Sequence, residues 1–309
     1  MSVLPEQLHA AVTSHSATFS PLYAGYLSDH GPMAALALYG LTEDANQATA
    51  YLTDYQQRLH PLDTAPDAYR VHLSNYRDAV SERGARAVLA DKLPDLVSGW
   101  VKDAYHPLIR IAYGCEFAVD AEVAAGLAYL HWCGPDPIMQ SLGESAIVNG
   151  SINALFTQMA DCAVGISPTR NFNQCLEMVL AQPAFKTAAA SVPDQLRTFS
   201  VTALQVFAST HNFFALHLVT GAHAFRVLQP FTGAHGDLLF GLGLLAGYAA
   251  VGAPDYDDRA AIETTVPSDW LPAIGTDEHD IKLAYSASRQ AQYFSDSRYV
   301  AAAIGYLGR

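Results

Sequence analysis

Apolar residues recur at helical spacing along nearly the whole chain, and this periodicity constrains the fold more than any other feature of the sequence. Runs in which β-branched and polar residues alternate, as they do in strands, are almost absent. Proline and glycine interrupt the apolar segments at the points where helices are expected to end. The sequence therefore predicts an all-α protein.

The predicted helices form a single multi-helix, bundle-like domain. Neither a repeat of fixed period nor a long linker rich in Ser, Gly or Pro divides the chain, so we expect one domain over residues 1–309. The longest expected helix covers 195–228, and the last two cover 276–296 and 298–307. The other expected helices cover 34–39, 46–59, 68–89, 93–104, 108–132, 147–164, 171–180 and 238–251.

The composition excludes several classes of partner. The net charge is −13 and the lysines and arginines are scattered, whereas binding to nucleic acid requires clustered basic residues. The N-terminus lacks a basic start followed by an apolar run, and the most apolar segment, 238–252, is too short to span a bilayer. We therefore expect a cytoplasmic protein without a membrane or nucleic-acid partner. The four cysteines show no CxxC spacing, which predicts buried thiols.

Two of the twelve histidines stand directly before helix-start signals. His30 lies in DHGPM, with Pro32 two residues later, and His106 is followed at once by Pro107. Proline is favoured in the first turn of a helix, because the missing amide hydrogen is not needed there. Both histidines are therefore expected at the N-terminal edges of helices.

Three more histidines, His211, His217 and His223, lie in one apolar segment, THNFFALHLVTGAHAFR. One histidine on an apolar helix face is more often a hydrogen-bonded core residue than a ligand. Several buried imidazoles from different helices, however, are a known way to build a metal site in a bundle core. On an ideal helix His217 and His223 lie about 120° apart. Both reach one metal only if the helix bends near Gly221 or if the metal sits between their two faces.

Motifs for other chemistries are weak. Residues 241–246 (GLGLLA) match the dinucleotide-binding pattern, but they lie in an apolar helical segment instead of after a strand, which favours helix packing. A two-iron carboxylate bundle needs a pair of Glu-x-x-His motifs, and only Glu6–His9 is present. There is no P-loop, HExxH or GxSxG motif.

Four segments together resemble the questin oxidase-like family: DHGPMAALAL, YHPLIRIAYG, FALHLVTGAHAFR and DEHDIKLAYS. This α-helical family is associated with oxidative ring opening of anthraquinone-type polyketides and related aromatics. Its members are described as Baeyer–Villiger-type oxidases or as non-haem iron dioxygenases. In the latter, histidines and a carboxylated lysine hold the iron. The resemblance implies a small aromatic substrate and dioxygen as partners.

Carried onto this chain, the resemblance implies Fe(II) as cofactor and carbon dioxide bound as a carbamate on Lys282. It implies imidazole ligands at His30, His106, His217 and His223. A carbamate forms from the neutral amine, and burial beside a metal disfavours the ammonium form and stabilises the anion. In the alternative interpretation Lys282 extends to solvent or pairs with Asp280 or Glu278.

Two further residues are predicted to act near the substrate. His279 precedes Lys282 by three residues, on one helix face, and is a candidate for proton transfer or for supporting a ligand. Arg110, one turn after His106, is a candidate for steadying a phenolate or an anionic intermediate. Its alternative role is a buried ion pair with Glu116 or another acid.

The predicted activity is a metal-dependent dioxygenation in which an electron-rich phenolic substrate supplies the electrons. An alternative enzyme is a Baeyer–Villiger-type monooxygenase without bound metal, which requires NADPH and inserts one oxygen atom. An alternative outside catalysis is a helical binding protein whose histidines are structural and whose stability does not change in chelator.

Overall fold

The fold is helical throughout the computed structural model, which describes residues 4–145, 151–163, 165–166, 170–192, 195–255, 265–267, 270–271 and 275–307. Within these residues the all-α prediction is confirmed, because strands occur only in one two-stranded antiparallel sheet, which pairs Leu22 with Ser28. The α-helices are α1 (Glu6–Thr18), α2 (Gly31–Thr42), α3 (Ala45–Tyr55), α4 (Asp67–Arg83), α5 (Ala85–Leu96), α6 (His106–Glu116), α7 (Asp120–Cys133), α8 (Pro137–Ser145), α9 (Ile152–Gln158), α10 (Phe172–Ala181), α11 (Pro183–Ala189), α12 (Leu196–Thr210), α13 (Ala215–Leu228), α14 (Gly236–Ala250), α15 (Glu278–Phe294) and α16 (Arg298–Leu307). The strands are β1 (Leu22–Tyr23) and β2 (Leu27–Ser28), and short 3-10 helices cover Gln56–Arg58, Leu62–Thr64, Val97–Gly99, Lys102–Tyr105, Met159–Cys162 and Gln229–Phe231.

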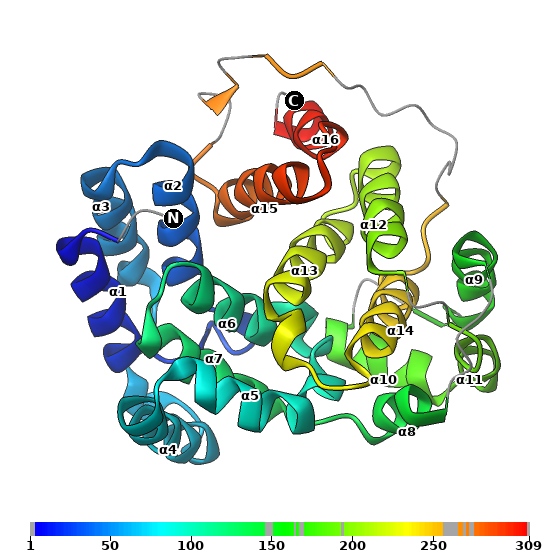
Figure 1. The fold of residues 1–309 in the computed structure, drawn as a ribbon, viewed down its shortest axis with the longest axis horizontal. Coiled ribbons are helices and arrows are strands. Elements are labelled where there is room, and N and C mark those ends of the chain that lie inside the picture. Colours follow the sequence, from blue (N-terminus) through cyan, green and yellow to red (C-terminus); the bar gives the residue numbers. More distant parts are fainter. Residues whose placement is uncertain are drawn as a thin grey trace.

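Four helices that matter for function are neighbours in space although they are far apart in sequence. Helix α6 packs against α13, α13 packs against α15, and α15 packs against α2. Figure 1 shows α6 and α13 in the middle of the molecule. Helix α15 crosses above them, and α2 lies beside the N-terminal end of α15. The core between them is apolar and rich in buried aromatic rings. The packing of these helices therefore brings together residues that are far apart in the sequence.

The expected helix over 195–228 is in fact two helices. His211 takes a left-handed conformation, with φ +47°, which ends α12. The side-chain oxygen of Asn212 then accepts the backbone amide hydrogen of Ala215 at 3.2 Å and begins α13. As a consequence, His217 lies in the first turn of a new helix instead of in the middle of a long one.

Other expected helices are also divided. The expected helix 68–89 breaks at Gly84, whose φ of +79° suits a residue without Cβ, and 108–132 breaks at Ala118, with φ +54°. The expected helix 93–104 does not exist as one element, because α5 gives way to 3-10 turns. The apolar periodicity continues through these left-handed residues, so it does not mark the breaks. Part of the expected helix 147–164 lies outside the described residues.

The dinucleotide-like motif lies wholly inside α14, which confirms that it serves helix packing. A Cβ on Gly241 would come within 2.6 Å of Phe199, and a Cβ on Gly243 within 2.2 Å of the indole of Trp100. None of the four cysteines forms a disulfide. Among the described helices, none combines the length and the apolar character that crossing a membrane requires. A single domain over 1–309 and a cytoplasmic location stay predictions.

Candidate metal centre

Four imidazoles lie at the N-terminal ends of four helices. His30 is the N-cap of α2 and His106 is the first residue of α6, each followed by proline within the first turn, as predicted. His217 is the third residue of α13 and His279 the second of α15. Each helix N-terminus carries unpaired amide hydrogens and a partial positive charge, which disfavours protonated histidine there. The ends of four separate helices therefore present imidazole groups to one site.

The four rings are in mutual contact, and we call them the imidazole cluster. The ring centroids of His30 and His106 are 4.4 Å apart, and those of His106 and His217 are 5.0 Å apart. The ring of His279 lies 4.7 Å from that of His30 and 5.5 Å from that of His217. The cluster is therefore a closed ring of four side chains. His279, the candidate for proton transfer or for supporting a ligand, thus lies in the cluster itself.

Lys282 lies beside the imidazole cluster, one turn after His279 on α15. Its side chain is buried, with only 1% of the residue exposed, and this burial lowers the pKa of its amine to about 7. Burial is the main cause that lowers the pKa of each cluster histidine, and like-charge repulsion from a protonated Lys282 lowers it further. The amine is therefore held where a neutral form is accessible near neutral pH.

Several ring nitrogens in the cluster have no hydrogen-bond partner among the described residues. They are Nδ1 of His30, Nε2 of His106 and both nitrogens of His217. Burial lowers the pKa of these three imidazoles well below the usual value, so they are neutral and each offers a lone pair. Orphaned buried nitrogens of this kind cost free energy unless a ligand satisfies them. The donor set thus fits a divalent transition metal.

The other nitrogens of two rings are already held by the protein. Nδ1 of His106 donates to the carbonyl oxygen of Asp103 at 2.5 Å, and Nδ1 of His279 donates to the carboxylate of Asp277 at 3.1 Å. A hydrogen bond of this type fixes the tautomer that leaves Nε2 as the lone-pair donor. Both rings are therefore oriented in advance as Nε2 ligands.

The chain that leads into His106 is held in an unusual conformation. Asp103, Ala104 and Tyr105 have φ values of +48°, +51° and +69°, three consecutive left-handed residues without a glycine. Such residues cost of order 1–3 kcal/mol each and persist only where their surroundings hold them. Asn173 accepts the Asp103 amide hydrogen at 2.8 Å, and the Tyr105 hydroxyl donates to a carbonyl oxygen of α14 at 3.1 Å. Contacts from α10 and α14 therefore position His106.

Sequence reasoning missed Glu278 as a candidate ligand. Its carboxylate is nearly buried, with one oxygen 4.0 Å from Nδ1 of His30 and the other 3.5 Å from Arg58. Glu278, His30 and His279 offer ligand atoms that all lie within 4.8 Å of one another. The sequence does contain a signal for the position of Glu278: Asp277 is a typical N-cap residue, which places Glu278 in the first turn of α15.

A pocket of about 670 Å³ opens from the imidazole cluster toward solvent. Its inner wall includes His30, His106, His217 and His279. Its outer part is aromatic, and several of these aromatic residues are strongly exposed, with Tyr26 71% and Phe213 44% accessible. The aromatic lining residues are Tyr23, Tyr26, Phe172, Phe213 and Phe214. A volume of this size suits a small organic molecule of several rings.

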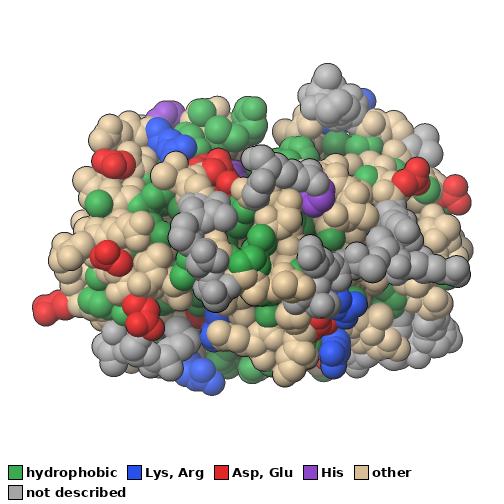
Figure 2. Space-filling model, turned by 90° about the horizontal axis from the view of Figure 1, so that it is seen from above, with side chains coloured by type: hydrophobic (Ala, Val, Ile, Leu, Met, Phe, Trp, Pro, Cys, Tyr) green, Lys and Arg blue, Asp and Glu red, His purple; other side chains and the backbone are tan. Residues whose placement is uncertain are grey.

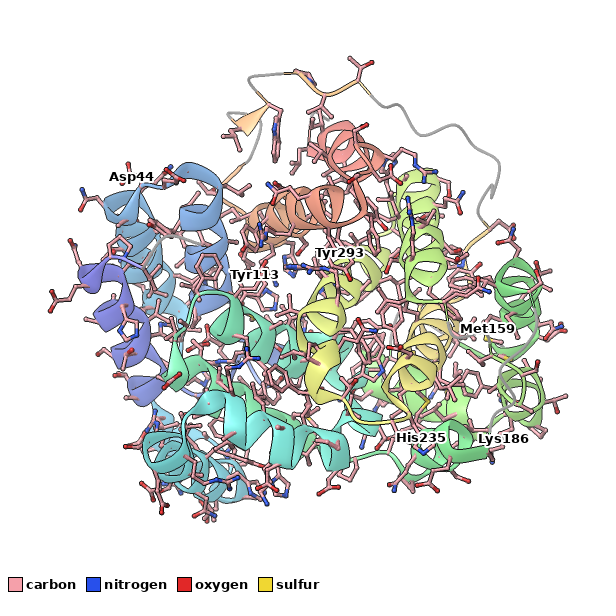
Figure 3. The ribbon with its side chains drawn as sticks, in the orientation of Figure 1. Asp44, Tyr113, Met159, Lys186, His235 and Tyr293 are labelled. Atoms are coloured by element: carbon pink, nitrogen blue, oxygen red, sulfur yellow. The ribbon has the colours of Figure 1, made fainter. Side chains whose placement is uncertain are left out.

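The structure does not bring His223 to the imidazole cluster. Helix α13 runs on past Gly221 without a break, so the six-residue interval points His223 away from His217. The Nε2 atom of His223 lies 3.2 Å from the carboxylate of Glu116, and its Nδ1 atom is 3.1 Å from the hydroxyl of Ser286. His223 thus belongs to a buried polar group between α6, α13 and α15. Tyr113, part of the same interior, lies below α15 in Figure 3.

Arg110 likewise lies away from the pocket. Its guanidinium makes two hydrogen bonds to Glu122, at 2.8 and 3.1 Å, and lies 3.8 Å from Asp29. Arg110 is fully buried and does not line the pocket. The alternative role from the sequence, a buried ion pair, is the one that the structure shows, with Glu122 as the acid in place of Glu116. Asp29 directly precedes His30 in the chain, so the buried charges of Arg110, Glu122 and Asp29 lie next to the cluster and help to hold His30 in position.

These features define a class: an all-α protein in which imidazoles from four helices, three of them with partnerless ring nitrogens, form the inner wall of an aromatic pocket. The model of the questin oxidase-like family matches residues 27–287, which include the whole imidazole cluster and Lys282, and the chain belongs to this family. The family name denotes oxidoreductases. A search of curated proteins found no significant match.

Proposed function

We propose that the imidazole cluster and Lys282 bind one iron(II) ion. The observation that carries this proposal is the set of buried imidazole nitrogens without partners on His30, His106 and His217, which come from three helices and contact one another or the ring of His279. In this proposal His279 takes the place that the family resemblance implies for His223. The ligands are then His30, His106, His217, His279 and Lys282 as its carbamate.

The carbamate on Lys282 follows from its environment. A neutral amine attacks carbon dioxide, forms a nitrogen–carbon bond and releases one proton to solvent, which leaves one negative charge on the new carboxylate. The lowered pKa of Lys282 makes the neutral amine available near pH 7. The partial positive charges at the N-termini of α2, α6, α13 and α15 favour the anion that forms. A metal ion favours it further.

The chain is proposed to be a dioxygenase that opens a ring of an aromatic, polyketide-like small molecule. Iron(II) in this site would supply the activation of dioxygen. The protein itself contributes the rest: Asp103 and Asp277 hold two imidazoles in the Nε2-donor tautomer, and the aromatic side chains stack against a planar substrate and exclude water. Phe213 lies 4.6 Å from the His279 ring, so a substrate on Phe213 reaches the cluster.

Metal analysis tests the site directly. The protein is purified without oxygen, its metals are quantified by mass spectrometry, and the same is done for His106→Ala and Lys282→Ala. Near-stoichiometric iron in the wild type, lost in both variants while the helical circular dichroism persists, supports the site. A wild type that takes up no metal from iron(II) solution contradicts it.

Labelled dioxygen tests the reaction. Iron-loaded protein is supplied with hydroxyanthraquinones and isotopically labelled dioxygen, with and without NADPH. Two labelled oxygen atoms in the product without NADPH support a dioxygenase. One labelled atom and a requirement for NADPH identify the Baeyer–Villiger alternative instead.

A further inference from the structure

The outer part of the pocket carries an unpaired cation. Among the described residues that line it, Arg170 is the only lysine or arginine. No carboxylate in the described part of the chain lies within ion-pair distance of Arg170, and its side chain is exposed to the pocket and solvent. An arginine without a partner at the mouth of a ligand pocket is free to bind a carboxylate or phenolate of a ligand.

The acidic groups that line the same pocket are already engaged by protein partners. The carboxylate of Glu278 lies 3.5 Å from the Arg58 guanidinium. The carboxylate of Asp103 accepts hydrogen bonds from the amide of Asn173 and from the thiol of Cys133. Neither acid is in contact with Arg170 in the structure. Among the described residues that line the pocket, the charged side chain without a partner is therefore that of Arg170, which is positive.

The residues around Arg170 add to this positive character. Residues 170–174 all line the pocket, and they lead into the N-terminus of α10, whose first turn is closed by the capping box of Asn171 and Gln174. The N-terminal end of α10 thus adds to the ends of α2, α6, α13 and α15 at the same cavity. The partnerless nitrogens of His30, His106 and His217, all more than nine-tenths buried, mark this cavity independently as a ligand site.

The apolar surfaces at the mouth fit a flat ring system. Tyr26 lies in the β1–β2 turn, Leu27 begins β2, and Phe213 and Phe214 directly precede α13; all four are substantially exposed. Single exposed aromatic side chains are common on protein surfaces, but several of them gathered around a pocket mouth indicate a binding surface. On the face seen in Figure 2, lysine and arginine side chains are dispersed.

We propose that the pocket selects an aromatic substrate that bears a carboxylate, and that Arg170 is the specificity-determining residue that binds this anion. The inference rests on the proposed function, because it assigns the substrate class of the same pocket. The ring system stacks between the mouth aromatics, the anion pairs with the Arg170 guanidinium, and the opposite end of the rings faces the imidazole cluster.

The test uses two probes with one ring system: a dihydroxyanthraquinone that carries a carboxylate, and its twin with a hydroxymethyl group in place of the carboxylate. Dissociation constants are measured by fluorescence quenching without oxygen, so that no turnover is needed. The wild type should bind the carboxylate probe about tenfold more tightly than its twin, the factor of one charge-assisted contact of about 1.4 kcal/mol. Arg170→Gln should abolish this preference and leave the affinity for the twin within twofold.

Two controls make the result specific. Arg170→Lys keeps the charge and should retain part of the preference, and Lys186→Gln removes a positive charge from α11, outside the pocket, and should change nothing. Figure 3 places Lys186 at the edge of the molecule. The proposal is overturned if Arg170→Gln loses affinity equally for both probes, or if this variant keeps the preference for the carboxylate probe. It is also overturned if the wild type binds neither probe. Metal uptake by the imidazole cluster is measured separately, so failure here is distinguishable from failure of the metal site.

Discussion

The Nε2 atom of His223 lies 3.2 Å from the Oε2 atom of Glu116, in the protein interior and outside the imidazole cluster. Burial lowers the pKa of His223, although the neighbouring carboxylate opposes this shift. Tyr285 and Arg289 also donate hydrogen bonds to Glu116, each at 3.3 Å. Both ring nitrogens of His223 therefore lie within 3.2 Å of a polar protein group, the Glu116 carboxylate or the Ser286 hydroxyl, whereas Nε2 of His106 and both nitrogens of His217 have no such neighbour among the described residues.

This difference predicts opposite outcomes for two histidine substitutions. His279→Ala should lower the affinity for iron(II) by at least tenfold, because it removes one ligand of the cluster. His223→Gln should leave metal affinity within about threefold and instead lower the thermal stability, by roughly 1–3 kcal/mol for a buried polar group that loses its partner. Metal titration and thermal unfolding of both variants measure the two effects separately. Loss of metal in His223→Gln with an unchanged fold would contradict the arrangement seen here.

Glu116 predicts a contribution to acid stability. Burial opposes its ionisation, but attraction to His223, Arg289 and Arg226 is stronger and lowers its pKa to about 2. A carboxyl whose pKa is depressed on folding stabilises the protein above the unfolded pKa of about 4.5, and this stability is lost as the pH falls toward 2. Glu116→Gln should therefore be less stable at pH 6, by up to about 3 kcal/mol.

The pH profile distinguishes this contribution from simple packing. Denaturant unfolding of the wild type and Glu116→Gln is compared from pH 6 to pH 3. The gap between the two proteins should narrow steadily below about pH 4.5. A constant gap over the whole range would mean that the charge of Glu116 contributes nothing to folding.

Lys282 predicts a second pH dependence, in an alkaline window, for the metal-free, carbon dioxide-free protein. Its pKa falls from the usual value to about 7 on folding, so the unfolded chain binds more protons than the folded one between pH 7 and about 10. Stability then rises with pH in this window, by at most about 1.4 kcal/mol per pH unit. Lys282→Met should remove the slope and stabilise the metal-free protein at pH 7. Equal slopes for both proteins in urea unfolding would show that Lys282 is not buried as an amine.

Local sequence signals were sufficient for part of the site. Proline after His30 and His106 predicted both helix starts, because the effect of proline on a first turn is local. The position of His217 depended on the helix break at His211, a left-handed residue inside a continuous apolar pattern. Such a break is stabilised by contacts between helices, which periodicity does not record.

The remaining parts depend on packing between distant segments. Asp103 orients His106 through a backbone carbonyl, and Asn173, seventy positions later, holds Asp103 in place. Nothing in the local sequence around Asp103 predicts this pairing. The ion pair between Arg110 and Glu122 also joins two helices, α6 and α7. The sequence alone therefore left two roles open for Arg110, one turn after His106.

Tyr105, the last residue of the left-handed turn before His106, packs closely against α14, and we expect this contact to hold the turn in place. A Cβ on Gly247 would come within 1.7 Å of the Tyr105 hydroxyl oxygen, so Gly247→Ala must displace this ring. The loss in stability should be about 1–3 kcal/mol, as for overpacking of a core. Metal affinity should fall with it, because the turn that orients His106 moves together with Tyr105.

The double variant Tyr105→Phe/Gly247→Ala separates this coupling from a general loss of packing. Removing the hydroxyl takes away the closest atom, so the double variant should regain part of the stability and of the metal affinity that Gly247→Ala loses. Urea unfolding and iron(II) titration of the wild type, both single variants and the double variant give the coupling energy. If the two losses add without any recovery, Tyr105 does not connect α14 to His106, and the turn is held by Asn173 alone.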